Sequence, residues 1–355
     1  MRLMWTRVMT GGFGNPNNKL IRALVEFKGY LYAMTANGAD GGEIHRSVTG
    51  EPGTWEEVVD RAFLAFGNTR HRPFRSLRVW NDRLYVGTGF VAQIWRSEDG
   101  TRWEKVADNG FGKGKRNLSV RSLELFRNCL YAGAGTEFIG SAGVYRSCNG
   151  DAWKPVVSDG FGRPWSNNHV YALKVFNDQL YAGTFNALQG AAVYRSHDGQ
   201  SWEPVAQRGF GHRGNVYVYE FRAYQPTPSA PAKLVAITGG NPAGGEAWIY
   251  DGTIWSPFAL NGFGKRRNSD IWTASQFESD FYVGTWKFPW QRSDDNGAEL
   301  WRYDYATGRW EAETLDGFGN PANDGFRVLF PWRGALYATL RNPTTGAELW
   351  KATVP

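Results

Sequence analysis

A short turn motif recurs along the chain at intervals of about fifty residues. It reads "RSEDGTRW" from Arg96 to Trp103, "RSCNGDAW" ending at Trp153, and "RSHDGQSW" ending at Trp202. A motif that returns at a fixed spacing indicates copies of one supersecondary unit, because each copy buries its apolar face only against its neighbours. This repeat constrains the fold more than any other feature of the sequence.

Aligning the chain with itself extends the motif to seven repeats. Each repeat has a closing tryptophan, a short strand, a loop that contains Phe-Gly, and then three further strands, and these segments are short, rich in aromatic or β-branched residues, and bounded by Gly, Asn or Asp. No segment shows sustained helical periodicity. The closing tryptophans are Trp5, Trp55, Trp103, Trp153, Trp202, Trp255 and Trp310. The loop phenylalanines are Phe13, Phe66, Phe111, Phe161, Phe210, Phe263 and Phe318.

Four short antiparallel strands per repeat predict an all-β protein, and seven such repeats predict a seven-bladed β-propeller that occupies residues 1–355 as a single domain. The last repeat, which ends in "AELWKATVP", has only three strands. The segment "MWTRVM" near the start supplies a fourth. We therefore expect a three-plus-one closure in which residues 3–8 pair with residues 346–351 and leave no exposed sheet edge.

Composition limits the class of protein. The 355 residues are 42% hydrophobic and 21% charged, with a formal net charge of +6, as expected for a folded chain with a mild preference for anionic partners. No apolar run is long enough to span a membrane, and the first residues lack the apolar core of a secretory signal, so we expect a cytoplasmic protein unless a leader was removed. In that compartment Cys129 and Cys148 should be free thiols, although the strands place them near each other.

The turn motif resembles the Asp-box of sialidase-type propellers, through Ser97, Asp99, Gly100 and Trp103. The wider repeat resembles bacterial kelch-like and Asp-box-like repeats over essentially the whole chain. This resemblance implies a propeller in which the turns lie on the face opposite the ligand, with each carboxylate bonded to its own turn's amides. Function must then lie where the repeats differ.

The repeats differ in an informative way at one position near the start of the strand that lines the channel. Arginine occupies it in four repeats and an aromatic residue in three: Arg22, Arg75, Arg121, Tyr171, Tyr219, Trp272 and Arg327. Guanidinium groups bind carboxylate, sulfate or phosphate in a bidentate manner, and aromatic faces pack on flat or ring-shaped groups. We therefore expect a site at the channel mouth for an anionic small molecule or sugar. The alternative is that the arginines pair with carboxylates such as Asp270 and Asp324 and the rings simply pack.

Residues close to this position offer acid–base chemistry. His169 and Tyr171 are the leading candidates for proton transfer, and His71 is the next, with Asp294 and Asp295 in reserve. Trp286 and Trp290, in the long loop of the sixth repeat, are further binding candidates. The arrangement is similar in kind to that of propeller lyases acting on uronates and to the arginine clamp of sialidases, which implies lyase-type or hydrolase-type chemistry. The sialidase tyrosine nucleophile cannot be assigned, since the Phe-Arg-Ile-Pro motif is missing.

Other functions remain open. The chain could be a non-catalytic propeller that binds a glycan or a protein, whereas short basic segments on separate loops argue against nucleic acid. We expect no organic cofactor, no membrane association and a monomer. A metal site is undetermined, because His169 and His212 match no local ligand motif.

Several recurring residues are expected to be structural. His45 should pack in the third-strand position that aromatic residues occupy elsewhere. The asparagines that follow the loop phenylalanine should cap loop amides. The third-strand arginines should form a structural charge pattern: Arg46, Arg96, Arg146, Arg195 and Arg302.

Overall fold

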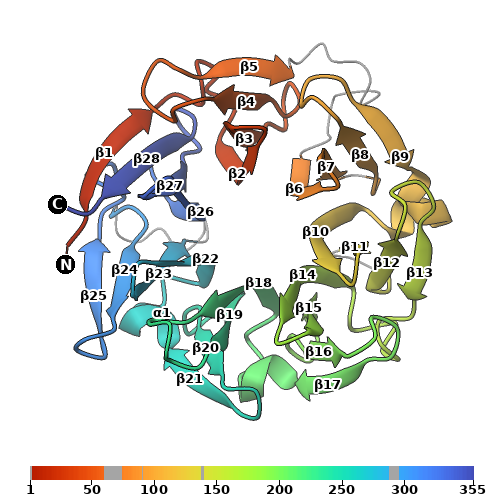
Figure 1. The fold of residues 1–355 in the computed structure, drawn as a ribbon. Helices are drawn as coiled ribbons and strands as arrows, with labels where there is room; N and C mark the ends of the chain where they lie inside the picture. The colour runs from red at the N-terminus through yellow and green to blue at the C-terminus, as the bar shows by residue number, and fades with distance from the viewer. Residues whose placement is uncertain (1, 60–73, 90, 137–139, 288–295) are drawn as a thin grey trace. The chain divides into compact units, whose positions relative to one another are not determined.

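The computed structural model describes residues 2–59, 74–89, 91–136, 140–287 and 296–355. Across these residues the chain is all-β, with only short helical turns at η3 (Asn109–Gly112), η4 (Gly114–Arg116), η5 (Arg208–Gly211) and α1 (Asn261–Gly264) (Figure 1). None of the described helices has the length and apolar character needed to cross a membrane.

The strands follow one another in groups of four that match the sequence repeats (Figure 1). The first two groups are β2 (Leu20–Phe27), β3 (Tyr30–Ala36), β4 (Ile44–Ser47) and β5 (Glu56–Val59), then β6 (Phe74–Trp80), β7 (Arg83–Thr88), β8 (Ile94–Ser97) and β9 (Glu104–Ala107). The next two are β10 (Ser119–Phe126), β11 (Cys129–Gly135), β12 (Gly143–Ser147) and β13 (Lys154–Val157), then β14 (His169–Phe176), β15 (Gln179–Phe185), β16 (Val193–Ser196) and β17 (Glu203–Ala206).

The remaining strands continue the pattern. They are β18 (Tyr217–Tyr224), β19 (Lys233–Gly239), β20 (Ala247–Tyr250) and β21 (Trp255–Ala259), then β22 (Asp270–Phe277), β23 (Asp280–Trp286), β24 (Leu300–Asp304) and β25 (Arg309–Thr314). The last are β26 (Gly325–Trp332), β27 (Ala335–Arg341), β28 (Glu348–Thr353) and, from the start of the chain, β1 (Met4–Met9).

The chain divides into two compact units. Unit 1 comprises Met1–Ile21, His212–Asn215 and Tyr219–Pro355, and unit 2 comprises Arg22–Gly211 and Val216–Val218. We call the leading strand of each group (β2, β6, β10, β14, β18, β22 and β26) its first strand.

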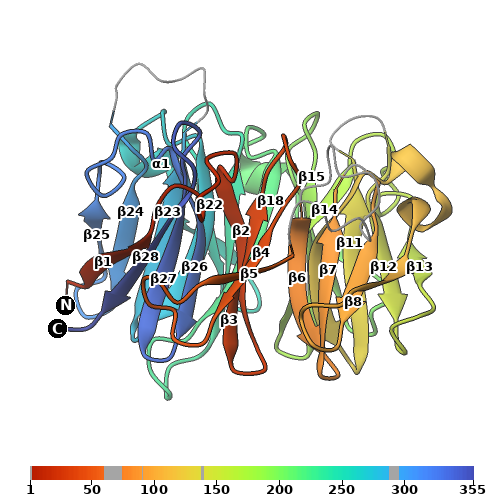
Figure 2. The same cartoon turned by 90° about the horizontal axis from the view of Figure 1, so that it is seen from above.

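Successive strands of a group pair antiparallel. Figure 2 shows three such strands, β6, β7 and β8, side by side. A further bridge joins the end of one group's second strand to the start of the next group's first strand. These bridges are Gly135↔His169, Phe185↔Tyr217, Gly239↔Asp270 and Trp286↔Gly325. The first residue of each of these first strands is thereby held by backbone pairing on the neighbouring group.

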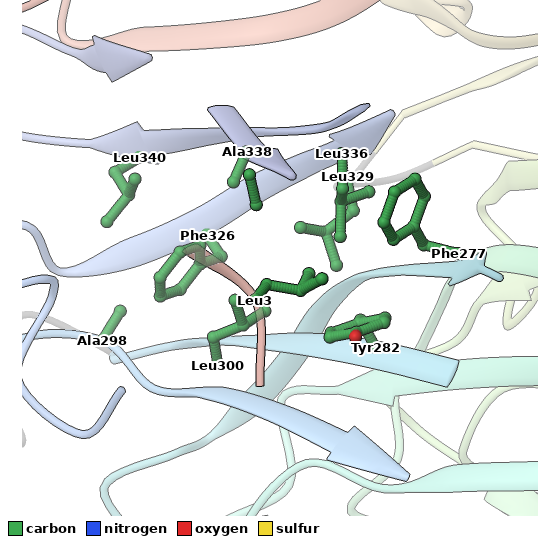
Figure 3. Close-up of a cluster of buried hydrophobic side chains, with 11 residues drawn as sticks. Leu3, Phe277, Tyr282, Ala298, Leu300, Phe326, Leu329, Leu336, Ala338 and Leu340 are labelled. Carbon is green, nitrogen blue, oxygen red and sulfur yellow. The ribbon is translucent and has the colours of Figure 1, made fainter. Parts of the chain in front are cut away.

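The predicted pairing of the first strand with the last is present in unit 1, but it joins residues 4–9 with residues 349–353 rather than residues 3–8 with residues 346–351. Strand β1 pairs antiparallel with β28 from Met4↔Thr353 to Met9↔Leu349. Just before it, Leu3 is buried in an apolar cluster with residues such as Leu300, Phe326 and Leu336 (Figure 3). The N-terminal segment therefore supplies both backbone pairing and core packing to unit 1.

The loops that contain Phe-Gly have an unusual backbone that is fixed by stacking. The loop phenylalanines of the described residues have positive φ angles, such as 59° at Phe161, a region that bulky residues seldom occupy. The Phe161 ring stacks on Tyr194 at 4.1 Å, and Phe111 on Tyr145 at 4.0 Å. The asparagines that follow the loop phenylalanines were expected to cap loop amides, but they bond to loop carbonyls instead. Their Nδ2 groups donate to loop carbonyls, as from Asn167 to Gly160 O at 3.0 Å, since the left-handed turn points these carbonyls inward.

The recurring turns have the predicted scaffold geometry. In unit 2, Asp99 Oδ1 accepts the backbone N–H groups of Thr101 and Arg102 at 2.7 and 2.8 Å. Burial opposes the shift, but these hydrogen bonds lower the pKa of Asp99 to about 2. His45 is buried against Glu43, as expected. Four of the five third-strand arginines form ion pairs, mostly within their own group of strands, as between Arg195 and Glu203. Arg96 also pairs with Asp151 of the next group, which supports a structural role.

The expectation of free thiols is wrong. Cys129 and Cys148 form a disulfide with a Cα–Cα distance of 4.1 Å. The register explains it, because Leu130 pairs with Ser147. Cys129 at the start of β11 therefore lies opposite Cys148, which directly follows β12. Disulfides persist in oxidising compartments, so this bond weighs against the cytoplasmic localisation, which stays a prediction.

Candidate functional site

The position at which the repeats divide into arginine and aromatic residues coincides with a β-bulge. In β6, β10, β14, β22 and β26 the pairing register shifts across one residue, and that residue is Arg75, Arg121, Tyr171, Trp272 or Arg327. A bulged residue has no partner of its own in the ladder, so its side chain can be directed independently of the sheet, and bulges are enriched next to active sites. The backbone thus singles out the same position as the sequence comparison.

In unit 1 the bulged residues belong to a cluster of two indoles and two guanidinium groups. Trp272 and Trp286 stack with centroids 4.5 Å apart and an interplanar angle of 18°. Arg327 lies 5.3 Å from the Trp272 ring, and its Nη1 donates to the Trp272 carbonyl at 3.3 Å. Arg341 lies 5.9 Å from the Trp286 ring and pairs with Asp324. The cluster therefore combines aromatic faces with positive charge.

Glycine allows this stack to form against the backbone. A Cβ atom on Gly325 would lie 2.6 Å from Trp286 Cδ1 and 3.0 Å from the Trp272 ring. These distances are shorter than real Cβ contacts, so any side chain at residue 325 would displace the indoles. The small residue at the start of β26 is therefore a requirement of the Trp272–Trp286 pair.

Asp270 lies two residues before Trp272 and is fully buried. Ser269 Oγ donates to Oδ2 at 2.6 Å, the Gly240 N–H donates to Oδ1 at 2.9 Å, and Tyr219 also hydrogen-bonds to this carboxyl. Burial raises the pKa of Asp270 to about 6, although these three hydrogen bonds oppose the shift. The carboxyl group therefore changes charge within a pH range close to neutral.

The equivalent position in unit 2 holds a histidine. His169 Nδ1 lies 2.9 Å from the Val170 carbonyl, and Nε2 lies 2.8 Å from Ser119 Oγ. Because a carbonyl can only accept, Nδ1 carries the proton in the neutral ring and Nε2 accepts the Ser119 hydroxyl. The Tyr171 ring lies edge-on to His169 at 5.0 Å, and the Arg121 guanidinium lies 4.2 Å from the Tyr171 centroid.

The two units therefore bring together different subsets of the predicted residues. Unit 1 assembles Trp272, Trp286 and Arg327, with Tyr219 reaching them through Asp270. Unit 2 assembles Arg121, Tyr171 and His169. Arg22 and Arg75 occupy the corresponding place on β2 and β6 and are partly exposed. His71, Trp290, Asp294 and Asp295 lie outside the described residues.

Exposure differs between the arginines and the acid–base candidates. Arg121 and Arg327 are partly exposed. In contrast, His169 is 1% exposed and Asp270 is 0% exposed, and the binding candidate Trp272 is also buried. The arginines are thus more accessible to a ligand than either titratable group.

The basic segment at residues 265–267 is partly neutralised. Lys265 Nζ and Arg267 Nη2 both lie 2.8 Å from Oε1 of Glu299, which is fully buried. Burial opposes the shift, but the hydrogen bonds from Arg267 and Lys265 lower the pKa of Glu299. His212 is likewise occupied, with Nδ1 2.8 Å from Glu246 Oε1. Across the described residues no group of three or more His, Cys, Asp or Glu side chains is arranged to hold a metal ion.

Sequence reasoning missed Ser119 and the titration of Asp270. Both stand two residues before the variable position, where the repeats read Leu20, Pro73, Ser119, His169, Tyr217, Asp270 and Gly325. This second variable column was visible in the sequence. Its polar members form the hydrogen bonds beneath the bulges.

No family model matches the chain, and no curated protein matches it. Among solved structures, the extracellular domain of a hybrid two-component system from B. thetaiotaomicron aligns with a TM-score of 0.63 and 14% identity over 98% of this chain. This chain spans 40% of the length of that protein. A thermostable family-43 glycoside hydrolase aligns over 68% of this chain and 95% of its own, at 12% identity and a TM-score of 0.42. The first alignment is a likeness of fold, and the second is too weak to carry an argument.

Proposed function

We propose that the repeats are the blades of a seven-bladed β-propeller in which β1 completes the last blade. The antiparallel groups of four strands and the pairing of β1 with β28 support this proposal. The three-plus-one arrangement leaves β28 without an open edge, which is the arrangement that closes a propeller.

We propose that the protein binds an anionic ligand, a small molecule or sugar that carries a carboxylate, sulfate or phosphate, through the bulged residues of its first strands. The observation that carries the proposal is the pairing of an arginine with an aromatic ring at this position in both units, Arg121 with Tyr171 and Arg327 with Trp272. The N–H donors of a guanidinium lie in its plane, so contact with a ring does not by itself occupy them. Arg327 Nη1 donates to the Trp272 carbonyl, which holds the guanidinium beside the ring, and an anion would be recognised by the other N–H donors of the fork.

Binding fits the geometry better than catalysis does. His169, the leading candidate for proton transfer, has both ring nitrogens engaged inside the protein and is 1% exposed. A general base must reach the proton that it removes, within hydrogen-bond distance or through one water. Acid–base chemistry by His169 and Tyr171 remains a hypothesis whose test is turnover of a bound ligand by the His169→Ala variant.

The proposal is tested by calorimetric titration with oligogalacturonate, a sulfated disaccharide and a sugar phosphate at two salt concentrations. We expect at least one of these anions to bind, with an affinity that falls as salt rises. Arg121→Ala or Arg327→Ala should weaken binding by about tenfold or more, and the lysine variants by less, because lysine keeps the charge but loses the planar fork.

Arg83→Ala provides the matched control. Arg83 is a surface arginine that pairs with Glu98, away from the bulges, so its removal should leave binding unchanged. Failure of all three anions to bind, or equal losses in the control and the bulge variants, would reject the proposal.

A further inference from the structure

A separate cavity of about 500 Å³ lies in unit 2, away from the bulges. It is formed between the loop that follows β13 and the strands β16 and β17, and its lining includes Asp159, Phe161, Arg163, Tyr194, Trp202 and Gln207. Cavities of this size hold small ligands, particularly where aromatic walls carry a few placed polar groups. We call this cavity the β17 groove.

The aromatic wall of the β17 groove is rigid. Phe161 stacks on Tyr194 with an interplanar angle of 6°, and Trp202 meets Phe161 edge-on at 5.5 Å. The Tyr194 hydroxyl accepts a hydrogen bond from Asn167 Nδ2 at 3.0 Å. Tyr194 is buried behind this wall, and these contacts hold the partly exposed Phe161 and Trp202 in place. The two rings offer apolar surface to the C–H groups of a ring-shaped ligand at a low entropic cost.

The polar wall of the β17 groove is held in place by glutamines. Arg163 Nη1 donates to Gln189 Oε1 at 3.0 Å, and Nη2 donates to Gln207 Oε1 at 2.9 Å. Within the part of the chain that the structure describes, Arg163 has no carboxylate partner. Asp159 lies on the same loop, and both charges act on the Tyr194 hydroxyl. The residues that line the groove thus include one cation and one anion, whose charges balance.

We infer that the β17 groove binds a neutral saccharide. Planar polar side chains that donate (Arg163), accept (Asp159) or do both (Gln200 and Gln207) match the hydroxyl groups of a sugar, and the fixed rings match its apolar face. The balanced charge favours an uncharged ligand over the anion proposed for the bulges, since an anion would gain from Arg163 and lose to Asp159.

The test is titration of the full chain with neutral pentasaccharides (cellopentaose, xylopentaose, mannopentaose and laminaripentaose). We expect one of them to bind with little dependence on salt. Trp202→Ala should weaken binding by about tenfold or more, and Asp159→Ala by a similar factor. Asp159 is exposed, so its variant tests the groove without disturbing the core.

The preceding repeat supplies a matched control. Trp153 is the closing tryptophan equivalent to Trp202, and it contacts Phe111 at 5.9 Å without lining the β17 groove. Trp153→Ala should therefore carry a similar structural cost and leave neutral-sugar binding unchanged. The bulge variants Arg121→Ala and Arg327→Ala should also leave it unchanged, which separates this inference from the anion site. Absence of binding by all four sugars, or binding that is insensitive to both Trp202→Ala and Asp159→Ala, would overturn it.

Discussion

The clusters beneath the bulges of β14 and β22 occupy the same place in their repeats and hold opposite chemistry. In unit 2 the first residue of the strand is His169, whose ring nitrogens lie within hydrogen-bond distance of Ser119 Oγ and the Val170 carbonyl. In unit 1 it is Asp270, whose carboxyl accepts hydrogen bonds from Ser269 and the Gly240 N–H. Both residues are buried, and both lie beneath a ring that an arginine contacts.

The difference shows how one backbone position can be used in two ways. A neutral imidazole with both nitrogens bonded is accommodated at little cost, because no charge is removed from water. A carboxylate in the same surroundings loses its hydration, and burial therefore raises the pKa of Asp270 to about 6. The backbone position determines that the side chain is buried. The type of side chain determines whether this burial acts on a charged group.

The largest effect should come from deleting residues 1–10, which affects unit 1 alone. The deletion removes β1 and the buried side chains of Leu3 and Val8, and by area it should cost about 5 kcal/mol. Thermal unfolding should show the loss, and hydrogen exchange should show faster opening in unit 1 than in unit 2. Removal of residues 354–355, which follow β28, is the control. An unchanged melting temperature after deletion of residues 1–10 would refute the closure of the last group of strands by β1.

Loss of the disulfide should destabilise unit 2 instead of unit 1, since the disulfide lies in unit 2 alone. Thiol titration of the unfolded chain without reductant should find no free thiols. Replacing both Cys129 and Cys148 by serine should destabilise unit 2 by at most about 3 kcal/mol, from the entropy of a loop with a sequence separation of 19. Two titratable thiols in protein isolated without reductant would contradict the bond.

The pH response should separate Asp270 from His169. An acid whose pKa is raised on folding favours the folded state while it is protonated. The stability due to Asp270 is therefore complete below pH about 4 and is lost as the pH rises through about 6, by about 2 to 3 kcal/mol. Asp270→Asn should remove this loss, so its denaturation midpoint should exceed that of the wild type at pH 8 but not at pH 4. Parallel pH profiles for the two proteins would reject this account.

The smallest expected effect compares the two arginines directly. Arg121→Ala and Arg327→Ala should each weaken anion binding by about 1.5 kcal/mol, near the contribution of one hydrogen bond to a charged group. If both units bind independently, calorimetry should lose one site in each variant. An equal loss of all binding in either variant would instead indicate a single site.

The repeat allowed much of the fold to be anticipated, including the strands, the turns and the pairing of β1 with β28. The signal was strong because each repeat must place the same apolar residues to pack, as Phe161 does on Tyr194. The residues at the variable position could also be chosen from the sequence, since variation among otherwise similar repeats is itself visible.

The hydrogen bonds of the site could not be anticipated. The bulge that directs Arg121 depends on a register shift between Val120 and Ser122, and no residue there has a bulge signature of its own. The contact between Ser119 and His169 spans a bridge between two groups of strands. The disulfide was misjudged because the compartment was inferred from the first residues, while the opposed positions of Cys129 and Cys148 are a property of the hairpin.

The bulges also bear on how such a chain can evolve. A residue outside the ladder is not needed for strand pairing, so replacing a partly exposed one such as Arg121 by another type need not alter the strands that flank it. Repeats that began as duplicates could then acquire different recognition residues one substitution at a time. The extra residue in the bulged first strands would be the place where specificity can change while the scaffold is inherited intact.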